Sequence, residues 1–152
     1  MSELSNNKLN ILIVEDDSDD FLFFKEAVEK LEVVNELSVA TSHVELFSHL
    51  DANKIFDVIF LDINLPVVDG KECLKQIKAN EKYKEVPIII FSGSNAQRDV
   101  DAVYEYGAHY HVVKPYAHIN YVASLKIVLG INWKEKQPRP LKENFVVDLT
   151  FN

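Results

Sequence analysis

Short apolar runs alternate with segments of helical periodicity along most of this 152-residue chain, and that alternation restricts its possible folds more than any other feature. The first run, Leu9 to Val14, is almost continuously aliphatic, which is typical of a parallel strand buried on both faces. The next segment, Asp19 to Leu31, has apolar residues at spacings of three and four, so we predict an amphipathic helix capped by Ser18 or Asp19. A strand followed by a helix is therefore the first structural unit.

Four further units of the same kind follow the first. We predict their strands at residues 36–41, 58–61, 88–91 and 109–113. We predict their helices at residues 42–50, 71–80, 96–107 and 119–129. Asp69 is the expected cap of the helix that begins at Lys71. Five strand–helix units with short connections predict an α/β fold with an open, doubly wound, five-stranded parallel sheet.

The charge and composition of the chain exclude several classes of protein. Sixteen Lys and Arg residues against twenty-four Asp and Glu residues give a formal net charge of −8, the wrong sign for a protein that covers phosphates. We therefore expect no direct binding of DNA, RNA or anionic membranes. Cys73 is the only cysteine, so no intramolecular disulfide is possible, and Met1 to Asn10 lacks the apolar segment of a signal peptide. These features predict a cytoplasmic protein.

Chemically active side chains follow four of the five predicted strands. The acidic run of residues 15–17 follows the first strand, and Asp62 follows the third. Ser92 closes the fourth strand, and Lys114 follows the fifth. Because the carboxyl ends of parallel strands meet at one edge of an open α/β sheet, these carboxylates, one hydroxyl and one ammonium group should lie together.

The carboxylates at this edge would repel one another unless a proton or a cation offset their charge. Carboxylate oxygens together with a backbone carbonyl suit Mg²⁺. For Glu15, Asp16 and Asp17, an equally simple interpretation is an acidic cluster that complements the dipole of the following helix. Asp62 differs, because it directly follows an apolar strand and leads into no immediate helix. Lys114 could pair with Asp62 or bind the oxygens of a phosphoryl group.

These strand ends resemble those of a known family. The motifs are Ile11-Leu12-Ile13-Val14-Glu15-Asp16-Asp17, Leu61-Asp62-Ile63-Asn64-Leu65-Pro66 with Asp69-Gly70, Phe91-Ser92-Gly93 and Val113-Lys114-Pro115. Each is weak alone, but the four in this order resemble the receiver domain of two-component response regulators from about Leu9 to Gly130. The resemblance implies a receiver domain at residues 9–131 with the CheY-like, flavodoxin-like strand order 2-1-3-4-5.

The resemblance implies a role for each acidic residue. Asp62 matches the phosphoacceptor, whose carboxylate attacks a phosphohistidine or a small acyl phosphate. Asp16 matches the direct Mg²⁺ ligand, Glu15 matches the acidic neighbour that acts through water, and Asn64 would add its backbone carbonyl. Mg²⁺ would shield the incoming phosphoryl charge and align the attack. Asp17 has no counterpart in this set, and we expect it to cap the helix or to support the ligands.

The hydroxyl and the cation of the site also match the family, whereas one further position departs from it. Ser92 matches the switch hydroxyl, and Lys114 matches the cation; both bind oxygens of the acyl phosphate. Three residues before the lysine the family has Tyr or Phe as a rotamer switch, and here that position is His111. His111 could swing inward as a switch and titrate near neutral pH, or it could be a surface histidine without a switching role.

The resemblance implies signalling rather than turnover of a substrate. A sensor histidine kinase or phosphotransfer protein would phosphorylate Asp62, and the added charge would change contacts with a downstream protein target. The length, the acidic pair and the long tail are similar to those of stand-alone single-domain response regulators, such as those partnered with bacterial phytochromes. A receiver-like interaction module that works without phosphorylation is the alternative.

Two other classes with a similar sheet fit the sequence less well. A phosphatase of the haloacid dehalogenase type also uses an aspartyl nucleophile, but Asp62-Ile63-Asn64 lacks the second acid of its Asp-x-Asp motif. A flavodoxin-like FMN-binding protein would offer hydroxyls and amides in its first loop, and the acidic run at residues 15–20 would repel the phosphate.

Residues 132–152 lie outside the strand–helix pattern and form a C-terminal tail. Pro138 and Pro140 bracket an extended stretch, and Phe145 to Phe151 is apolar and β-prone. Because so many apolar side chains are unfavourable in water, we expect the tail to pack on the receiver domain or on a second copy of the chain. A homodimer is therefore a further prediction.

Overall fold

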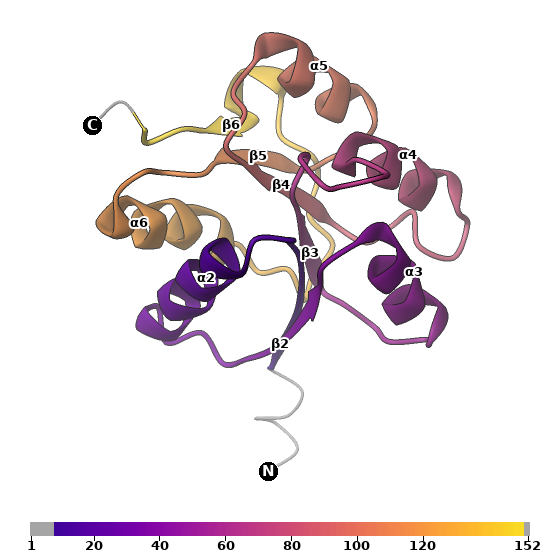
Figure 1. Ribbon diagram of the computed structural model, residues 1–152, viewed down its shortest axis with the longest axis horizontal. Coiled ribbons are helices and arrows are strands. Elements are labelled where there is room, and N and C mark those ends of the chain that lie inside the picture. The colour runs from indigo at the N-terminus through magenta and orange to yellow at the C-terminus, as the bar shows by residue number, and fades with distance from the viewer. Residues whose placement is uncertain (1–7, 151–152) are drawn as a thin grey trace.

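The computed structural model describes residues 8–150, which form one sheet with helices on both faces (Figure 1). The strands are β1 (Leu9–Val14), β2 (Asn35–Ala40), β3 (Val58–Leu61), β4 (Ile88–Ser92), β5 (Tyr110–Val113) and β6 (Val146–Val147). The helices are α2 (Ser18–Lys30), α3 (His43–Asp51), α4 (Gly70–Ala79), α5 (Gln97–Glu105), α6 (His118–Leu129) and the short 3₁₀ helix η1 (Lys142–Asn144). The α/β fold and its five strand–helix units are confirmed. Within the described range, no helix combines the length and the apolar character that a membrane span requires.

The sheet is parallel throughout, with the strand order β2-β1-β3-β4-β5-β6. The expected order 2-1-3-4-5 is therefore confirmed, but the sheet has six strands rather than five. The extra strand comes from the tail, where Val146 pairs with His111 and Val147 pairs with Val112. A strand of two residues is too short to produce a periodic signal in the sequence, so the pattern could not reveal it.

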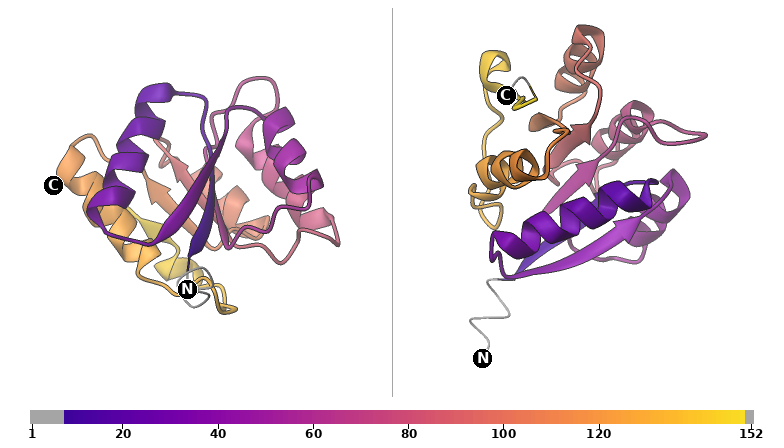
Figure 2. Two further views of the ribbon diagram at one scale, coloured as in Figure 1. Left: turned by 90° about the horizontal axis from the view of Figure 1, so that it is seen from below. Right: turned by 60° about the vertical axis from the view of Figure 1, so that its left-hand side comes forward.

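Two apolar layers hold the helices on the sheet. Successive residues of a strand point to opposite faces, so Ile11 and Ile13 of β1 pack with α2 and α6, whereas Leu12 and Val14 pack with α3, α4 and α5. Figure 2 shows α2 and α6 together on one side of the sheet and α3 and α4 on the other. Because every residue of the central strands β3 and β4 is buried, only the strand ends and loops remain to carry polar chemistry.

Aspartates cap two of the helices that begin at the carboxyl edge of the sheet, α2 and α4. Asp17 caps α2, and its side chain accepts hydrogen bonds from the backbone N–H groups of Asp19 and Asp20. The prediction of Ser18 or Asp19 as this cap was wrong, because the helix already begins at Ser18. The predicted cap of α4 is confirmed, since Asp69 accepts a hydrogen bond from the backbone N–H of Glu72 at 3.0 Å.

The loop between β3 and α4 folds tightly against the helix that follows it. The N–H of Gly70 donates to the carbonyl oxygen of Ile63 at 2.8 Å. A Cβ atom at Gly70 would lie 2.1 Å from the carbonyl oxygen of Asp62, which no side chain could tolerate without a backbone shift. Glycine at this position therefore lets α4 begin directly beside Asp62, the residue that follows β3.

The tail returns along the β5 edge of the sheet and packs on α5 (Figure 2). Phe145 is completely buried, with its ring against Tyr104 at a centroid distance of 4.9 Å. The hydroxyl of Tyr104 donates to the carbonyl of Pro140 at 3.1 Å, and Arg139 lies over the same ring at 4.2 Å. The described part of the tail therefore packs within the chain. The expected apolar segment extends to Phe151, which lies outside the described residues.

Replacement of Phe145 by alanine tests this packing. Phe145→Ala removes a fully buried ring between α5 and the sheet, so we expect it to lower the free energy of unfolding by about 3 to 5 kcal/mol. Val146→Ala in the same strand is the control, because Val146 is 39% exposed and should cost no more than about 1 kcal/mol. Urea unfolding followed by circular dichroism measures both. Equal losses for the two variants would contradict the described packing.

Candidate functional site

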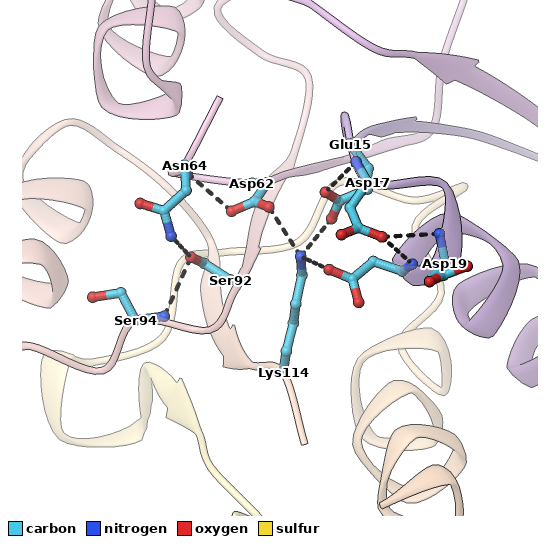
Figure 3. A network of polar contacts seen from close by, with 9 residues as sticks. Glu15, Asp17, Asp19, Asp62, Asn64, Ser92, Ser94 and Lys114 are labelled. Atoms are coloured by element: carbon cyan, nitrogen blue, oxygen red, sulfur yellow. Dashed lines mark hydrogen bonds and ion pairs between the residues drawn. The ribbon is translucent and has the colours of Figure 1, made fainter. Parts of the chain in front are cut away.

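The polar residues at the ends of four strands converge at one edge of the sheet (Figure 3). Glu15 follows β1, Asp62 follows β3, Ser92 closes β4 and Lys114 follows β5. Glu15, Asp62 and Ser92 are buried, with exposed fractions of 2%, 5% and 0%. The structure thus brings together the side chains that sequence analysis placed at this edge.

Lys114 is the centre of this cluster. Its ammonium group donates to Glu15, to Asp62 at 2.9 Å and to Asp20 at 2.8 Å. The pair between Lys114 and Asp62 that the sequence suggested is therefore present. The backbone N–H of Lys114 donates to the carbonyl of Ser92 at 2.8 Å, which fixes the start of the lysine side chain beside β4.

The charges of this cluster strongly influence one another. Burial raises the pKa of Glu15 from 4.5 to about 7, and the negative charge of Asp62 adds to this effect, although Lys114 opposes it. Burial would lower the pKa of Lys114, but its attraction to Asp62 and its hydrogen bonds to Asp20 and Glu15 outweigh that effect, so its pKa lies above the ordinary value. Lys114 therefore stays charged, whereas Glu15 exchanges its proton near neutral pH.

Asp62 presents both carboxylate oxygens to defined donors. Oδ1 accepts a hydrogen bond from the backbone N–H of Asn64 at 2.9 Å, and Oδ2 accepts one from Lys114 at 2.9 Å. The Ser92 hydroxyl makes only long contacts, at 3.4 Å with the Asn64 amide nitrogen and at 3.4 Å with the backbone N–H of Ser94. A carboxylate fixed at both oxygens lies beside a hydroxyl that is weakly held and can find another partner.

Three acidic residues of the cluster have the geometry of a divalent cation site. Glu15, Asp16 and Asp62 each offer a ligand oxygen, and these oxygens lie within 4.8 Å of one another. Asp16 is exposed while the other two are buried, so the group opens to solvent on one side. An all-oxygen donor set with an open side suits a hard cation such as Mg²⁺, which keeps several water ligands. The contribution of the Asn64 backbone carbonyl stays a prediction.

Two further residues belong to this cluster. Asp20 contacts Lys114 from the first turn of α2, and only its place in a helix that begins at the carboxyl edge of the sheet could have indicated this. Ser94 donates from its hydroxyl to Asp99 at 2.7 Å, and Asp99 forms an ion pair with Lys71 at 2.9 Å. The loop after β4 is therefore tied to both α4 and α5.

His111 is completely buried, so the interpretation as a surface histidine was wrong. Phe145 of the tail covers the imidazole, with ring centroids 6.3 Å apart, and strand alternation alone could not predict this cover. Burial lowers the pKa of His111 below 6.5, so the imidazole is neutral at neutral pH, contrary to the expected titration in that range. Its Nε2 lies 2.9 Å from the carbonyl oxygen of Ser94, which requires a donating Nε2–H.

Comparison with known proteins agrees with the fold and the site. The family model of the response regulator receiver domain matches residues 11–126, and the chain belongs to this family. The chain is 30% identical to the response regulator Rcp1 of Synechocystis over 148 residues, which cover 92% of this chain and 99% of the relative. It is 29% identical to the chemotaxis protein CheY1 of Helicobacter pylori over 124 residues, which cover 82% of this chain and 99% of the relative.

Solved structures show the same likeness. The Mn²⁺-bound form of Rcp1 superposes with a TM-score of 0.75 at 26% identity, over 88% of this chain and 99% of that chain. The phosphorylated cyanobacterial phytochrome response regulator RcpA superposes with a TM-score of 0.77 at 26% identity, over the same shares of the two chains. Receiver domains are signalling modules of two-component systems, so neither the phosphatase nor the FMN-binding alternative describes this chain.

The raised pKa of Glu15 predicts a specific pH dependence of stability. A carboxyl group with a folded pKa of about 7 against an ordinary value of 4.5 stabilises the fold below pH 4.5, and that contribution is lost as the pH rises through 7. Between pH 4.5 and 7.5 in EDTA, the free energy of unfolding of the wild-type protein should therefore fall by on the order of 2 kcal/mol relative to that of Glu15→Gln.

Urea unfolding at a series of pH values measures this difference. Glu29→Gln on the exposed side of α2 is the control, and its difference from wild type should not change over the same range. A constant difference between the wild type and Glu15→Gln would show that the pKa of Glu15 is the same in the folded and unfolded states.

Proposed function

We propose that this chain is a phosphorylation-dependent response regulator, in which Asp62 accepts a phosphoryl group from a sensor histidine kinase or a phosphotransfer protein. The observation that carries the proposal is the buried Asp62 carboxylate at the end of β3, 2.9 Å from Lys114 and within 4.8 Å of the oxygens of Glu15 and Asp16. An aspartate in this position can act as a nucleophile, because its neighbours offset the charge of a phosphoryl donor.

The transfer would use groups that already surround Asp62. A carboxylate oxygen of Asp62 forms a bond to phosphorus while the nitrogen–phosphorus bond of the donor phosphohistidine breaks, and the histidine nitrogen keeps the electron pair. Lys114 and the backbone N–H of Asn64 lie where they would stabilise the new acyl phosphate, and the weakly held Ser92 hydroxyl can turn toward it. A bound Mg²⁺ would shield the negative charge that the phosphoryl group brings to these carboxylates.

The named relatives support the same chemistry. Rcp1 is known in a Mn²⁺-bound form, and RcpA is known in a phosphorylated form. Both are similar to this chain over 88% of its length, and RcpA is a phytochrome response regulator. We therefore infer that a kinase of the phytochrome class is a suitable first candidate for the phosphoryl donor of this chain.

Phosphorylation by a small donor tests the role of Asp62. With acetyl phosphate and Mg²⁺, we expect the wild-type protein to gain one phosphoryl group and Asp62→Asn to gain none, because the amide is not a nucleophile. Asp69→Asn is the matched control, since Asp69 caps α4 and asparagine caps a helix equally well. Intact-mass spectrometry reads all three proteins. An unmodified wild-type protein would favour the module that works without phosphorylation.

We further propose that His111 carries the phosphorylation signal from the site to the tail. The backbone of Ser94 links Ser92 to His111. Its N–H contacts the Ser92 hydroxyl at 3.4 Å, and its carbonyl accepts a hydrogen bond from His111 at 2.9 Å. The backbone N–H of His111 donates to the carbonyl of Phe145 at 3.1 Å. Movement of Ser92 toward a phosphoryl group would therefore pull on Ser94 and release the imidazole that supports Phe145, which changes the surface offered to a downstream protein.

Amide hydrogen exchange at β6 tests this connection. In the wild-type protein, phosphorylation should change the exchange rates of Val146 and Val147, whereas His111→Phe keeps a ring but lacks the Nε2–H and should abolish this change. Acetyl phosphate should still modify His111→Phe as fully as the wild type. His49 of α3 supplies the control, because it is half-buried and its Nε2 lies 2.9 Å from the carbonyl oxygen of Val39, away from β6; His49→Phe should show the same change at β6 as the wild type. Equal changes at β6 in His111→Phe and the wild type would rule out this role.

A further inference from the structure

A second polar region lies at the amino ends of β3, β4 and β5, the opposite edge of the sheet from Asp62. A cavity of about 790 Å³ opens there between the loop that leads from α4 to β4 and residues 133–139 of the tail. Cavities that hold small ligands measure roughly 300 to 1,000 Å³. The tail therefore forms one wall of a space that is large enough for a small molecule.

Three cationic or protonatable side chains line this cavity without a carboxylate partner. Lys78 donates to the backbone carbonyls of Lys84 at 3.0 Å and Val86 at 2.9 Å, and within the described residues it forms no ion pair. Arg139 likewise donates from its Nε to the carbonyl of Ala108 and from one terminal nitrogen to the carbonyl of Tyr104 in α5, and His109 lines the same cavity. Neutral carbonyls position these groups without an ion pair, although the negative charge of Glu85 acts on Lys78.

Three acidic residues line the same cavity, and two of them have a lysine nearby. Asp57 forms an ion pair with Lys134 at 2.8 Å, and Glu85 lies 3.8 Å from Lys136. The lining as a whole has five Lys and Arg side chains against three carboxylates, so its formal charge is positive. A positive lining is unexpected in a chain whose formal net charge is −8.

The positive groups disfavour one another electrostatically. Burial lowers the pKa of Lys78 to about 8; the charge of Glu85 opposes this shift, and the charge of Arg139 adds to it. Burial lowers the pKa of His109 to about 4, and both Lys78 and Arg139 add to this effect. An anion between Lys78 and Arg139 would remove this repulsion.

Two aromatic side chains also line the cavity, Trp133 from the layer that packs with α2 and α6 and Phe56 from the layer on the other face of the sheet. Both are largely buried, with 4% and 7% of their surface exposed. The ring of His109 meets Trp133 edge-on with centroids 5.7 Å apart, and the Trp133 Nε1–H donates to the carbonyl of Val128 at 2.8 Å, which fixes the indole. A planar, apolar group could pack against this fixed indole.

We propose that this cavity binds a small phosphate monoester that carries a planar ring. Its phosphate group lies between Lys78 and Arg139, and its ring packs on the side that Trp133 lines. Phosphate suits this pair, because arginine and lysine are the residues that proteins use to bind phosphate oxygens. The site is separate from the acidic cluster and does not depend on phosphorylation of Asp62.

Fluorescence of Trp133 offers a direct test, because it is the only tryptophan of the chain. We would titrate the full chain with adenosine monophosphate, with adenosine and with inorganic phosphate, each to about 5 mM, in EDTA so that no divalent cation recruits phosphate to the acidic cluster. We expect a saturable change in fluorescence with adenosine monophosphate. Adenosine and inorganic phosphate should each bind at least about tenfold more weakly. Isothermal titration calorimetry would measure the stoichiometry, which should be one ligand per chain.

Variants of two lysines on α4 locate the binding. Lys78→Met removes the cavity ammonium and should weaken binding of the monophosphate about tenfold or more. Lys75→Met removes an exposed ammonium of the same helix outside the cavity and should leave binding unchanged. Arg139→Gln is a second cavity variant, and circular dichroism checks that each protein is folded.

Three outcomes would overturn the proposal. The first is the absence of saturable binding in the wild-type protein. The second is equal affinity for the monophosphate and for adenosine or inorganic phosphate, since the site would then not recognise both groups. The third is binding that folded Lys78→Met and Arg139→Gln proteins both retain in full.

Discussion

A single ammonium group holds together the edge of the sheet on which the chemistry depends. Lys114 contacts carboxylates from the ends of β1 and β3 and from the first turn of α2, and all of these groups lie close together in a largely buried space. Without a positive charge among them, Glu15 and Asp62 would repel each other strongly. Lys114 therefore acts as an internal counterion, and any metal ion or phosphoryl group that enters the site must share these carboxylates with it.

Much of this arrangement follows from the sequence because of one geometric rule. Parallel strands end at a common edge, so Glu15, Asp62, Ser92 and Lys114 had to meet there once the strands were located. What the sequence could not predict depends on contacts between distant segments. The role of Asp20 depends on how α2 packs on the sheet, and the burial of His111 depends on Phe145, thirty-four positions further along the chain. Periodicity describes the faces of an element but does not say what covers them.

The tail connects the two polar regions of the molecule. Residues 133–139 form a wall of the cavity at the amino edge of the sheet. Arg139 then packs on Tyr104 of α5, and Phe145 packs against His111 nearer the carboxyl edge. His111 in turn contacts the loop that contains Ser94. A chain of direct contacts thus leads from the phosphorylation site proposed here to the tail, and the same tail reaches the amino edge of the sheet.

The pairing of β6 with β5 also bears on aggregation. An unpaired edge strand presents a row of free N–H and C=O groups that can add a strand from another molecule. Residues 110–113 of β5 have the sequence Tyr-His-Val-Val, which carries none of the lysines or prolines that usually discourage such addition. Two residues of β6 are enough to occupy this edge. Any event that detaches the tail from β5 therefore exposes an unpaired edge strand that can pair with another molecule. The short β6 thus guards against aggregation as well as completing the sheet.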